Sequence, residues 1–368
     1  MNKEQIEFNK QLTSLRKQSR LKSCIWGGEE KQGCSNKIVA AHSIQRGKIL
    51  EGISEDGKVY FLNTVPADDL SEMKARFELE GIKKFSTFSG FCGEHDKRLF
   101  QPIEDKLFKG EERQKDLYAY RAAAKELHSN KESAELMKIM LGDALQEEDS
   151  PPHMKMFLPQ ILSGEMIVPD FIREEMLKLV MNDFGRAKYR NTLVTVKEHN
   201  LVCSHIKEVL EGREESKLTH QVYTFDFLYP IACSAAFIPY FNHDGSRAIS
   251  EHEMVKLSTA SVSNIEDCNT VFLNVIPEND KTHIMFSYFN KGAKFGSSIE
   301  SLFLSQEEKL KVGLSNVMVN YVENMAVKPS YIDTMFSESE QSKLLKAFYN
   351  NILDPNRFTK VNVNLFVQ

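Results

Sequence analysis

The sequence predicts an α+β protein in which a small metal-binding finger, a helical middle region and a C-terminal antiparallel or mixed sheet with helices follow one another. Three of the six cysteines lie among glycines and small polar residues in the first hundred positions. Residues 111–148 and 169–214 repeat apolar side chains at helical spacing, and runs of β-branched and aromatic residues begin near position 220. We therefore predict three parts, 1–110, 111–215 and 216–368.

Length and charge set broad limits on the function. The chain has 368 residues, of which 41% are hydrophobic and 27% charged, and its net charge is -5. Such a chain is not a polycation that coats nucleic acid, so any contact with nucleic acid must be local. No apolar run reaches the roughly 18 residues of a membrane span. The N-terminus is charged from Lys3 onward, so we expect a cytoplasmic protein without a membrane partner.

Local patterns predict the elements of the N-terminal part. A helix is expected over 3–22, because apolar residues recur there without Pro or Gly. The runs at 37–44 (KIVAAHSI) and 57–65 (GKVYFLNTV) have strand patterns, and we predict that they pair as a hairpin. A second helix is expected around 70–79. The stretch at 91–100 (FCGEHDKRLF) predicts a glycine-containing turn that opens onto a short helix.

The middle region is predicted to be helical. Residues 111–148 are rich in Ala, Leu, Glu and Lys, which favours one or two helices. The sequence Asp-Ser-Pro-Pro at 149–152 breaks the pattern and marks a boundary or hinge. Residues 169–214 then predict a long helix with an interruption near Gly185.

The C-terminal part differs from the middle region in its pattern of residue types. Its β-branched and aromatic runs, bounded by Asn, Asp, Gly and Pro, predict four or five strands of an antiparallel sheet within 221–241, 255–263, 269–277 and 283–291. Two helical runs, at 301–324 and 337–350, end the chain.

The six cysteines fall into two groups. In a cytosolic protein they are expected to be reduced thiols. Cys203, Cys233 and Cys268 lie inside apolar stretches and are expected in the core. The other three lie in turn-like sequence, which is where cysteines that bind a metal are found.

The turn cysteines and a nearby histidine predict a structural zinc site. Zinc takes four ligands in a tetrahedron, often one pair on a turn and one pair at the start of a helix. Cys24 and Cys34 can supply the first pair, and Cys92 and His95 the second, since a C-x2-H step puts both side chains on one side of a helical turn. The nine-residue gap between Cys24 and Cys34 is longer than usual. The alternative is three unmetallated thiols in loops.

The N-terminal helix has a basic stretch. Between positions 10 and 22 there are five basic residues and no acidic one. We predict that they contact nucleic-acid phosphates, and the alternative is a solvated helix surface. The five predicted residues are Lys10, Arg16, Lys17, Arg20 and Lys22.

The order of cysteine turn, AAHSI at 40–44 and FCGEHD at 91–96 resembles a treble-clef finger of the HNH (His-Me finger) endonuclease superfamily, over roughly residues 20–108. The resemblance implies that His42 is the general base and that Asp96 holds a catalytic Mg²⁺ or Mn²⁺ against a DNA phosphate. Two positions depart from the pattern. Ala41 stands where a metal-binding side chain often precedes the histidine, and Asn63 is only a candidate for the middle Asn of the motif.

Two functions follow from these expectations. The first is a DNA-cleaving, HNH-like nuclease, and by analogy of architecture a bacterial effector of phage defence. The second is a non-catalytic protein in which the finger is a structural or nucleic-acid-binding module and the C-terminal part binds a protein partner or a small ligand. In that case His42 forms a hydrogen bond inside the finger or replaces one of the four zinc ligands, and Asp96 is a residue at the start of the helix that the helix dipole stabilises.

Overall fold

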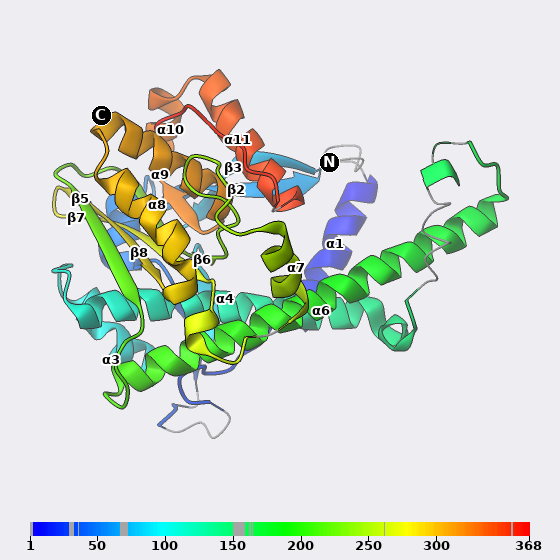
Figure 1. The fold of residues 1–368 in the computed structure, drawn as a ribbon, viewed down its shortest axis with the longest axis horizontal. Coiled ribbons are helices and arrows are strands. Elements are labelled where there is room, and N and C mark those ends of the chain that lie inside the picture. Colours follow the sequence, from blue (N-terminus) through cyan, green and yellow to red (C-terminus); the bar gives the residue numbers. More distant parts are fainter. Residues whose placement is uncertain are drawn as a thin grey trace.

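The computed structural model describes residues 3–28, 33–35, 37–66, 73–149, 159–161, 163, 165–260, 262–354 and 356–368 (Figure 1). The predicted fold class is confirmed, because the chain is a mixed α+β protein built on an antiparallel sheet. Each helix in the described part of the chain is too short or too polar to cross a membrane.

The main sheet has seven strands in the order β3-β2-β9-β6-β7-β8-β5, and every neighbouring pair is antiparallel. A separate pair consists of β1 (Ile38–His42) and β4 (Thr87–Cys92). The strands of the main sheet are β2 (Lys58–Pro66), β3 (Met73–Gly81), β5 (Thr219–Phe225), β6 (Ile231–Phe237), β7 (Val271–Glu278), β8 (Lys281–Tyr288) and β9 (Met325–Val327).

Two predictions for the N-terminal part are wrong. The runs at 37–44 and 57–65 do not pair with each other, because β1 pairs with β4 and β2 pairs with β3. The helix expected around 70–79 is strand β3 from residue 73 onward, and residues 70–72 lie outside the described part. The charged residues of β3 favour a helix, but pairing with β2 satisfies its backbone and places Ala75 and Phe77 against the core.

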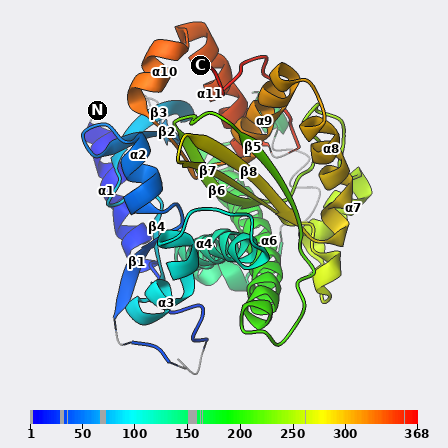
Figure 2. The ribbon, with the colours of Figure 1, turned by 90° about the vertical axis from the view of Figure 1, so that its left-hand side faces the viewer.

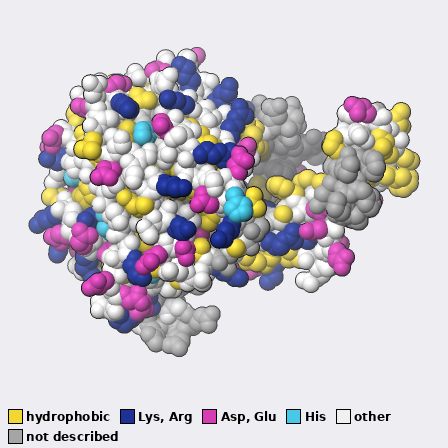
Figure 3. All heavy atoms as spheres, in the orientation of Figure 1, with side chains coloured by type: hydrophobic (Ala, Val, Ile, Leu, Met, Phe, Trp, Pro, Cys, Tyr) yellow, Lys and Arg dark blue, Asp and Glu magenta, His cyan; other side chains and the backbone are white. Residues whose placement is uncertain are grey.

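Two long helices, α4 (Glu112–Leu141) and α6 (Asp170–Leu210), confirm the predicted helical middle region. They run side by side and together project from the body (Figure 1). Figure 3 shows hydrophobic side chains at the far end of this projection, where Phe171 is 68% exposed. The expected interruption near Gly185 is absent. A Cβ atom at Gly185 would lie 2.8 Å from the Leu141 side chain, so the glycine allows close packing of the two helices.

Helices α4 and α6 cover one face of the main sheet. The other face is covered by four C-terminal helices, α8 (Ala293–Phe303), α9 (Glu307–Tyr321), α10 (Pro329–Met335) and α11 (Glu338–Leu353). The prediction of a strand within 255–263 is wrong, because residues 255–259 belong to helix α7 (Glu251–Thr259). Ser250 and Glu253 form a capping box at the start of α7, and this local signal favours a helix.

Side chains of the central strands alternate between the two faces of the sheet. On β7, Phe272 and Ile276 belong to the core that α4 and α6 cover, whereas Val271, Leu273 and Val275 face the C-terminal helices. Every residue of β7 is buried, because helices cover both faces.

The hydrophobic core crosses the boundaries of the three predicted parts, whose division of the chain stays a prediction. One continuous buried cluster includes Phe91 on β4, Tyr120 on α4, Cys203 on α6 and Phe272 on β7. The hairpin of β2 and β3 also lies at one edge of a sheet whose other strands come from the C-terminal part. The N-terminal segment is therefore packed into the body of the protein.

Candidate metal centre and the adjoining histidine

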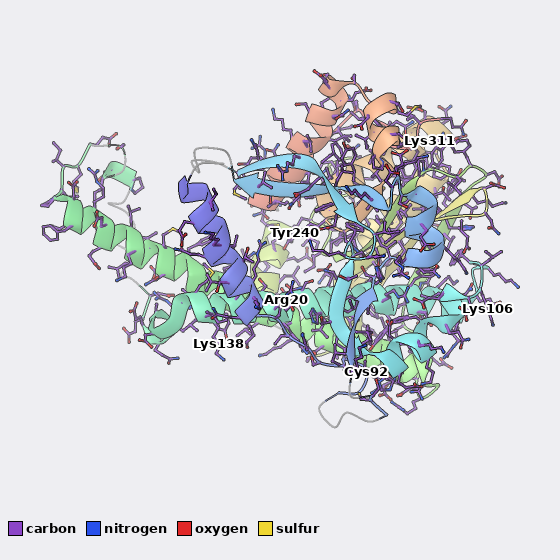
Figure 4. All side chains as sticks on the ribbon, turned by 180° about the vertical axis from the view of Figure 1, so that it is seen from behind. Arg20, Cys92, Lys106, Lys138, Tyr240 and Lys311 are labelled. Carbon is purple, nitrogen blue, oxygen red and sulfur yellow. The ribbon has the colours of Figure 1, made fainter. Side chains whose placement is uncertain are left out.

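The centre is built on β1, β4 and α3 (Gly93–Glu104), which gather beside α4 (Figure 2). Helix α3 begins directly after β4, with Cys92 at its N-cap position. The predicted helix opening at 91–100 is confirmed. His95 follows in the first turn, so the C-x2-H step brings both side chains to the same side. Figure 4 shows Cys92 at this junction of strand and helix.

The preceding turn brings Cys24 and Cys34 to the same point. The backbone N–H of Ile25 donates to the carbonyl of Gly90 on β4 over 2.9 Å, which fixes the chain next to Cys24. Gly33 has a φ of +63°, a conformation that glycine adopts without strain, and it immediately precedes Cys34. The long gap between the two cysteines therefore still allows them to meet.

The four side chains form one cluster with the geometry of a metal site. The Sγ atoms of Cys24 and Cys92 each lie 3.4 Å from Nδ1 of His95, and Sγ of Cys34 lies 3.6 Å from it. All four ligand atoms lie within 4.8 Å of one another. Zinc bonds of about 2.3 Å to sulfur and 2.05 Å to nitrogen at tetrahedral angles place S and N about 3.6 Å apart. The cluster can therefore hold a metal ion and is compatible with zinc.

The protonation of the cluster also suits a cation. Burial lowers the pKa of His95, which keeps the imidazole neutral as a metal ligand must be. Burial, together with the neighbouring Cys24 and Cys92, raises the pKa of the Cys34 thiol to about 12. Burial also acts to raise the pKa of Cys92, but hydrogen bonds from His95 and Ser35 outweigh it and lower the value to about 7. Three adjacent thiols cannot all ionise without a positive charge between them.

His42 lies at the end of β1 and is half-buried. Its Nε2 lies 2.9 Å from the carbonyl oxygen of Ile82, so this nitrogen carries a proton and donates it. Burial lowers the pKa of His42, and this effect outweighs the hydrogen bond to Ile82, which acts to raise it. The charges of Arg46 and Arg121 also lower this pKa, so the ring is neutral near pH 7. A neutral ring protonated at Nε2 has a lone pair on Nδ1, which can accept a proton or bind a metal.

Asp96 occupies the first turn of α3, where the resemblance places a metal ligand. Its Oδ1 atom is buried without a hydrogen-bond partner among the described residues. Burial raises the pKa of Asp96 above its ordinary value. The positive charge of Arg121 opposes this shift, and the negative charge of Glu104 adds to it. Arg121 and Glu104 also affect the pKa of His42, so both candidate catalytic residues lie in the field of the same ion pair. No hydrogen bond joins His42 to Asp96 among the interactions that the structure describes.

The ion pair next to Asp96 is a feature that sequence reasoning missed. Arg121 on α4 is 1% exposed, its guanidinium lies 4.1 Å from the centre of the Phe100 ring, and its Nη2 is 2.5 Å from Oε1 of Glu104. Asp96, Phe100 and Glu104 are spaced four residues apart on α3 and therefore share one face of that helix. That spacing is visible in the sequence, but only the packing of α4 against α3 brings in Arg121.

The two departures from the HNH pattern are explicit in the structure. Ala41 is 1% exposed and offers no ligand atom beside His42. Asn63 lies on β2, and its Nδ2 donates to Glu78 on β3 over 2.6 Å. In the described part of the chain, only one group of three or more His, Cys, Asp or Glu side chains is close enough to bind one metal ion. It is the cluster of Cys24, Cys34, Cys92 and His95.

The basic residues of the N-terminal segment are exposed on and just after α1 (Lys3–Gln18), which ends earlier than the helix expected over 3–22. Helix α1 packs on α4, and Figure 4 shows Arg20 just beyond its end, beside α4. The structure describes no ion pair for any of the five. The group comprises Lys10, Arg16, Lys17, Arg20 and Lys22.

Trp26 is a second feature that sequence reasoning missed. It is 7% exposed, its ring lies 6.5 Å from that of His95, and it meets Tyr120 edge to face at 5.3 Å. Lys207 on α6 donates to the backbone carbonyl of Trp26 over 2.8 Å. The metal centre is therefore connected to both long helices.

Comparisons with protein-family models, curated proteins and solved structures gave no match to this chain, so its function has to be argued from this site.

Proposed function

We propose that this chain is a zinc-stabilised, HNH-like nuclease that hydrolyses DNA phosphodiester bonds with Mg²⁺ or Mn²⁺. The observation that carries the proposal is His42 at the end of β1, in a unit of β1, β4 and α3 whose helix begins with two ligands of the cysteine cluster. Its Nε2–H is held by the Ile82 carbonyl, which leaves Nδ1 to take the proton of an attacking water.

Zinc is the metal that we propose for the cluster of Cys24, Cys34, Cys92 and His95. Three thiolates and one imidazole are a common set for structural zinc, and the sulfur–nitrogen distances fit its tetrahedron. Because four protein ligands complete the coordination, the proposed zinc ion stabilises the fold and leaves no position for a substrate.

Asp96 is the residue that we propose for the catalytic Mg²⁺ or Mn²⁺. A carboxylate is the ligand type these ions prefer, and Oδ1 of Asp96 is buried without a described partner. A bound divalent ion neutralises charge that develops on the phosphate oxygens during hydrolysis. The exposed basic residues of the N-terminal segment are proposed to hold the DNA backbone, and phage defence is the proposed biological context.

A plasmid-nicking assay tests the proposal. In His42→Gln the amide still donates to Ile82 but cannot act as a base, so nicking with Mg²⁺ or Mn²⁺ should fall by about 10² to 10⁴-fold without a change in melting temperature. His243→Gln, which changes a half-buried histidine that contacts Ser298, is the matched control and should retain full activity. Absence of nicking with both metals, or equal nicking by His42→Gln and the natural protein, would refute the nuclease.

A second candidate, a non-catalytic binding protein, is favoured by two specific observations. Ala41 supplies no ligand, and the buried guanidinium of Arg121 already provides a fixed positive charge on the face of α3 that carries Asp96. In this case the finger binds DNA without cutting it, and the C-terminal part binds a protein or a small ligand.

DNA affinity in the absence of cleavage separates this second candidate from the first. Replacing Arg16 and Lys17 by Gln should weaken DNA binding and reduce its salt dependence. Replacing the exposed Lys343 and Lys346 of α11 by Gln should alter neither the affinity for DNA nor its salt dependence. Equal DNA affinity of the two double variants would remove the N-terminal segment from both candidates.

A further inference from the structure

A cavity of about 440 Å³ lies behind the metal centre, between the turn at 23–28 and the two long helices. Tyr120, Leu127 and Lys131 line it from one face of α4, and Asn200, Cys203, Ser204 and Lys207 line it from one face of α6. Its volume lies within the range of small-molecule pockets, which is about 300 to 1,000 Å³. The proposed catalytic residues His42 and Asp96 are not among the residues that line it.

Two positively charged side chains line the cavity, next to Cys24 of the candidate metal centre. Lys131 and Lys207 both line it, and the described lining includes no Asp or Glu. The structure describes no ion pair for either lysine. The carboxylates nearest to Lys207 along α6, Glu208 and Glu211, are instead paired with Arg213. Two lysine side chains thus line one cavity, and neither forms an ion pair among the described residues.

The rest of the lining contains both polar and apolar side chains. Ser23, Asn200 and Ser204 have no described side-chain hydrogen bond within the protein, so their donors are available to a ligand. Tyr120 and Leu127 also line the cavity, and each is 1% exposed. This combination suits a ligand that carries both a charged group and an apolar or aromatic group.

We propose that this cavity binds a small phosphate monoester with an apolar or aromatic group, such as a mononucleotide. A phosphate monoester carries a charge of about -1.5 to -2 at pH 7, so lysines in the lining attract it more strongly than a DNA phosphodiester, which carries a single charge. The hydroxyl and amide groups of the lining supply further donors to phosphate oxygens. This inference does not depend on the proposed nuclease activity.

The only tryptophan of the chain adjoins the cavity and is its natural reporter. Lys207 is bonded to the carbonyl of Trp26, and its Nζ lies 5.5 Å from the centre of the Trp26 ring. Trp26 also packs on Tyr120, which lines the cavity. A phosphate that engages Lys207 should therefore change the fluorescence of Trp26.

Titrations with AMP, inorganic phosphate and adenosine, followed by Trp26 fluorescence and calorimetry, test the proposal. AMP should bind, inorganic phosphate should bind more weakly and compete with it, and adenosine should produce no saturable change. Lys131→Gln should weaken AMP binding at least tenfold. Lys138→Gln, near the exposed end of the same helix and outside the cavity, should leave it unchanged (Figure 4).

Three outcomes would overturn the proposal. The first is no saturable response to AMP at millimolar concentration, and the second is equal affinity of Lys131→Gln and Lys138→Gln for AMP. The third is full competition by a single-stranded oligonucleotide without terminal phosphates, which would assign the cavity to a DNA backbone. Melting curves of both variants show that they are folded, and since neither residue is in the proposed catalytic site, failure here leaves the nuclease proposal to its own test.

Discussion

Loss of the metal from the cluster of Cys24, Cys34, Cys92 and His95 should destabilise the whole chain and not the finger alone. The perturbation is Cys92→Ala, or treatment of the natural protein with a zinc chelator. A metal that is present at about 1,000 times its dissociation constant stabilises the folded state by about 4 kcal/mol. The cluster is part of a core that also includes α4, α6 and the sheet, so the structure predicts that all of these unfold together.

The size of the cooperative unit sets the expected change in melting temperature. An unfolding entropy of about 2.1 cal/mol/K per residue gives about 0.8 kcal/mol/K for 368 residues, so 4 kcal/mol corresponds to a fall of about 5 °C. If the finger over 20–108 unfolded by itself, its entropy would be about 0.19 kcal/mol/K, and its own transition would fall by about 20 °C.

Scanning calorimetry with and without chelator, together with elemental analysis, measures both quantities. We expect about one zinc per chain in the natural protein, none in Cys92→Ala, and one main transition that moves by about 5 °C. Cys233→Ala is the matched control, because Cys233 is a buried cysteine of β6 outside the cluster and its loss should leave the zinc content unchanged. Absence of zinc would refute the metal site, and a separate small transition that moves by about 20 °C would refute the shared core.

Two further predictions concern buried charges and pH. Burial lowers the pKa of His199 to about 4 in the folded protein. Between pH 4 and 6.5 the unfolded chain therefore binds more protons than the folded one. The contribution of neutral His199 to the free energy of unfolding should be complete above pH 6.5 and should be lost as the pH falls through this window. In His199→Gln the acid-dependent loss measured by urea unfolding should be smaller by up to about 3 kcal/mol, and an unchanged loss would contradict the assignment. Arg121→Met should lower the free energy of unfolding by about 3 kcal/mol, because it leaves Glu104 and Asp96 without their cation. Adding Glu104→Gln should recover part of this loss, and a double variant as unstable as the sum of its single changes would argue against a coupled pair.

The sequence determined the local features of this protein. Helical spacing predicted α4 and α6, and the glycine-containing turn predicted the start of α3. The turn-like sequence around Cys24 and Cys34, together with the spacing of Cys92 and His95, predicted the four residues of the candidate metal cluster. These features depend on residues close to each other in the chain, whose geometry the backbone limits to a few choices. The five basic residues near the N-terminus were likewise visible, although their contact with DNA stays a prediction.

Only the tertiary structure decided which distant segments meet. Residues 57–65 have a strand pattern that fits several partners, and the choice of β3 over β1 depends on which arrangement buries both faces of the seven-stranded sheet. In the same way, Arg121 reaches the face of α3 that carries Asp96, and Lys131 and Lys207 share a cavity, because α4 packs against both α3 and α6. Side chains on separate helices leave no common spacing in the sequence, so their meeting is set by the packing of the core alone.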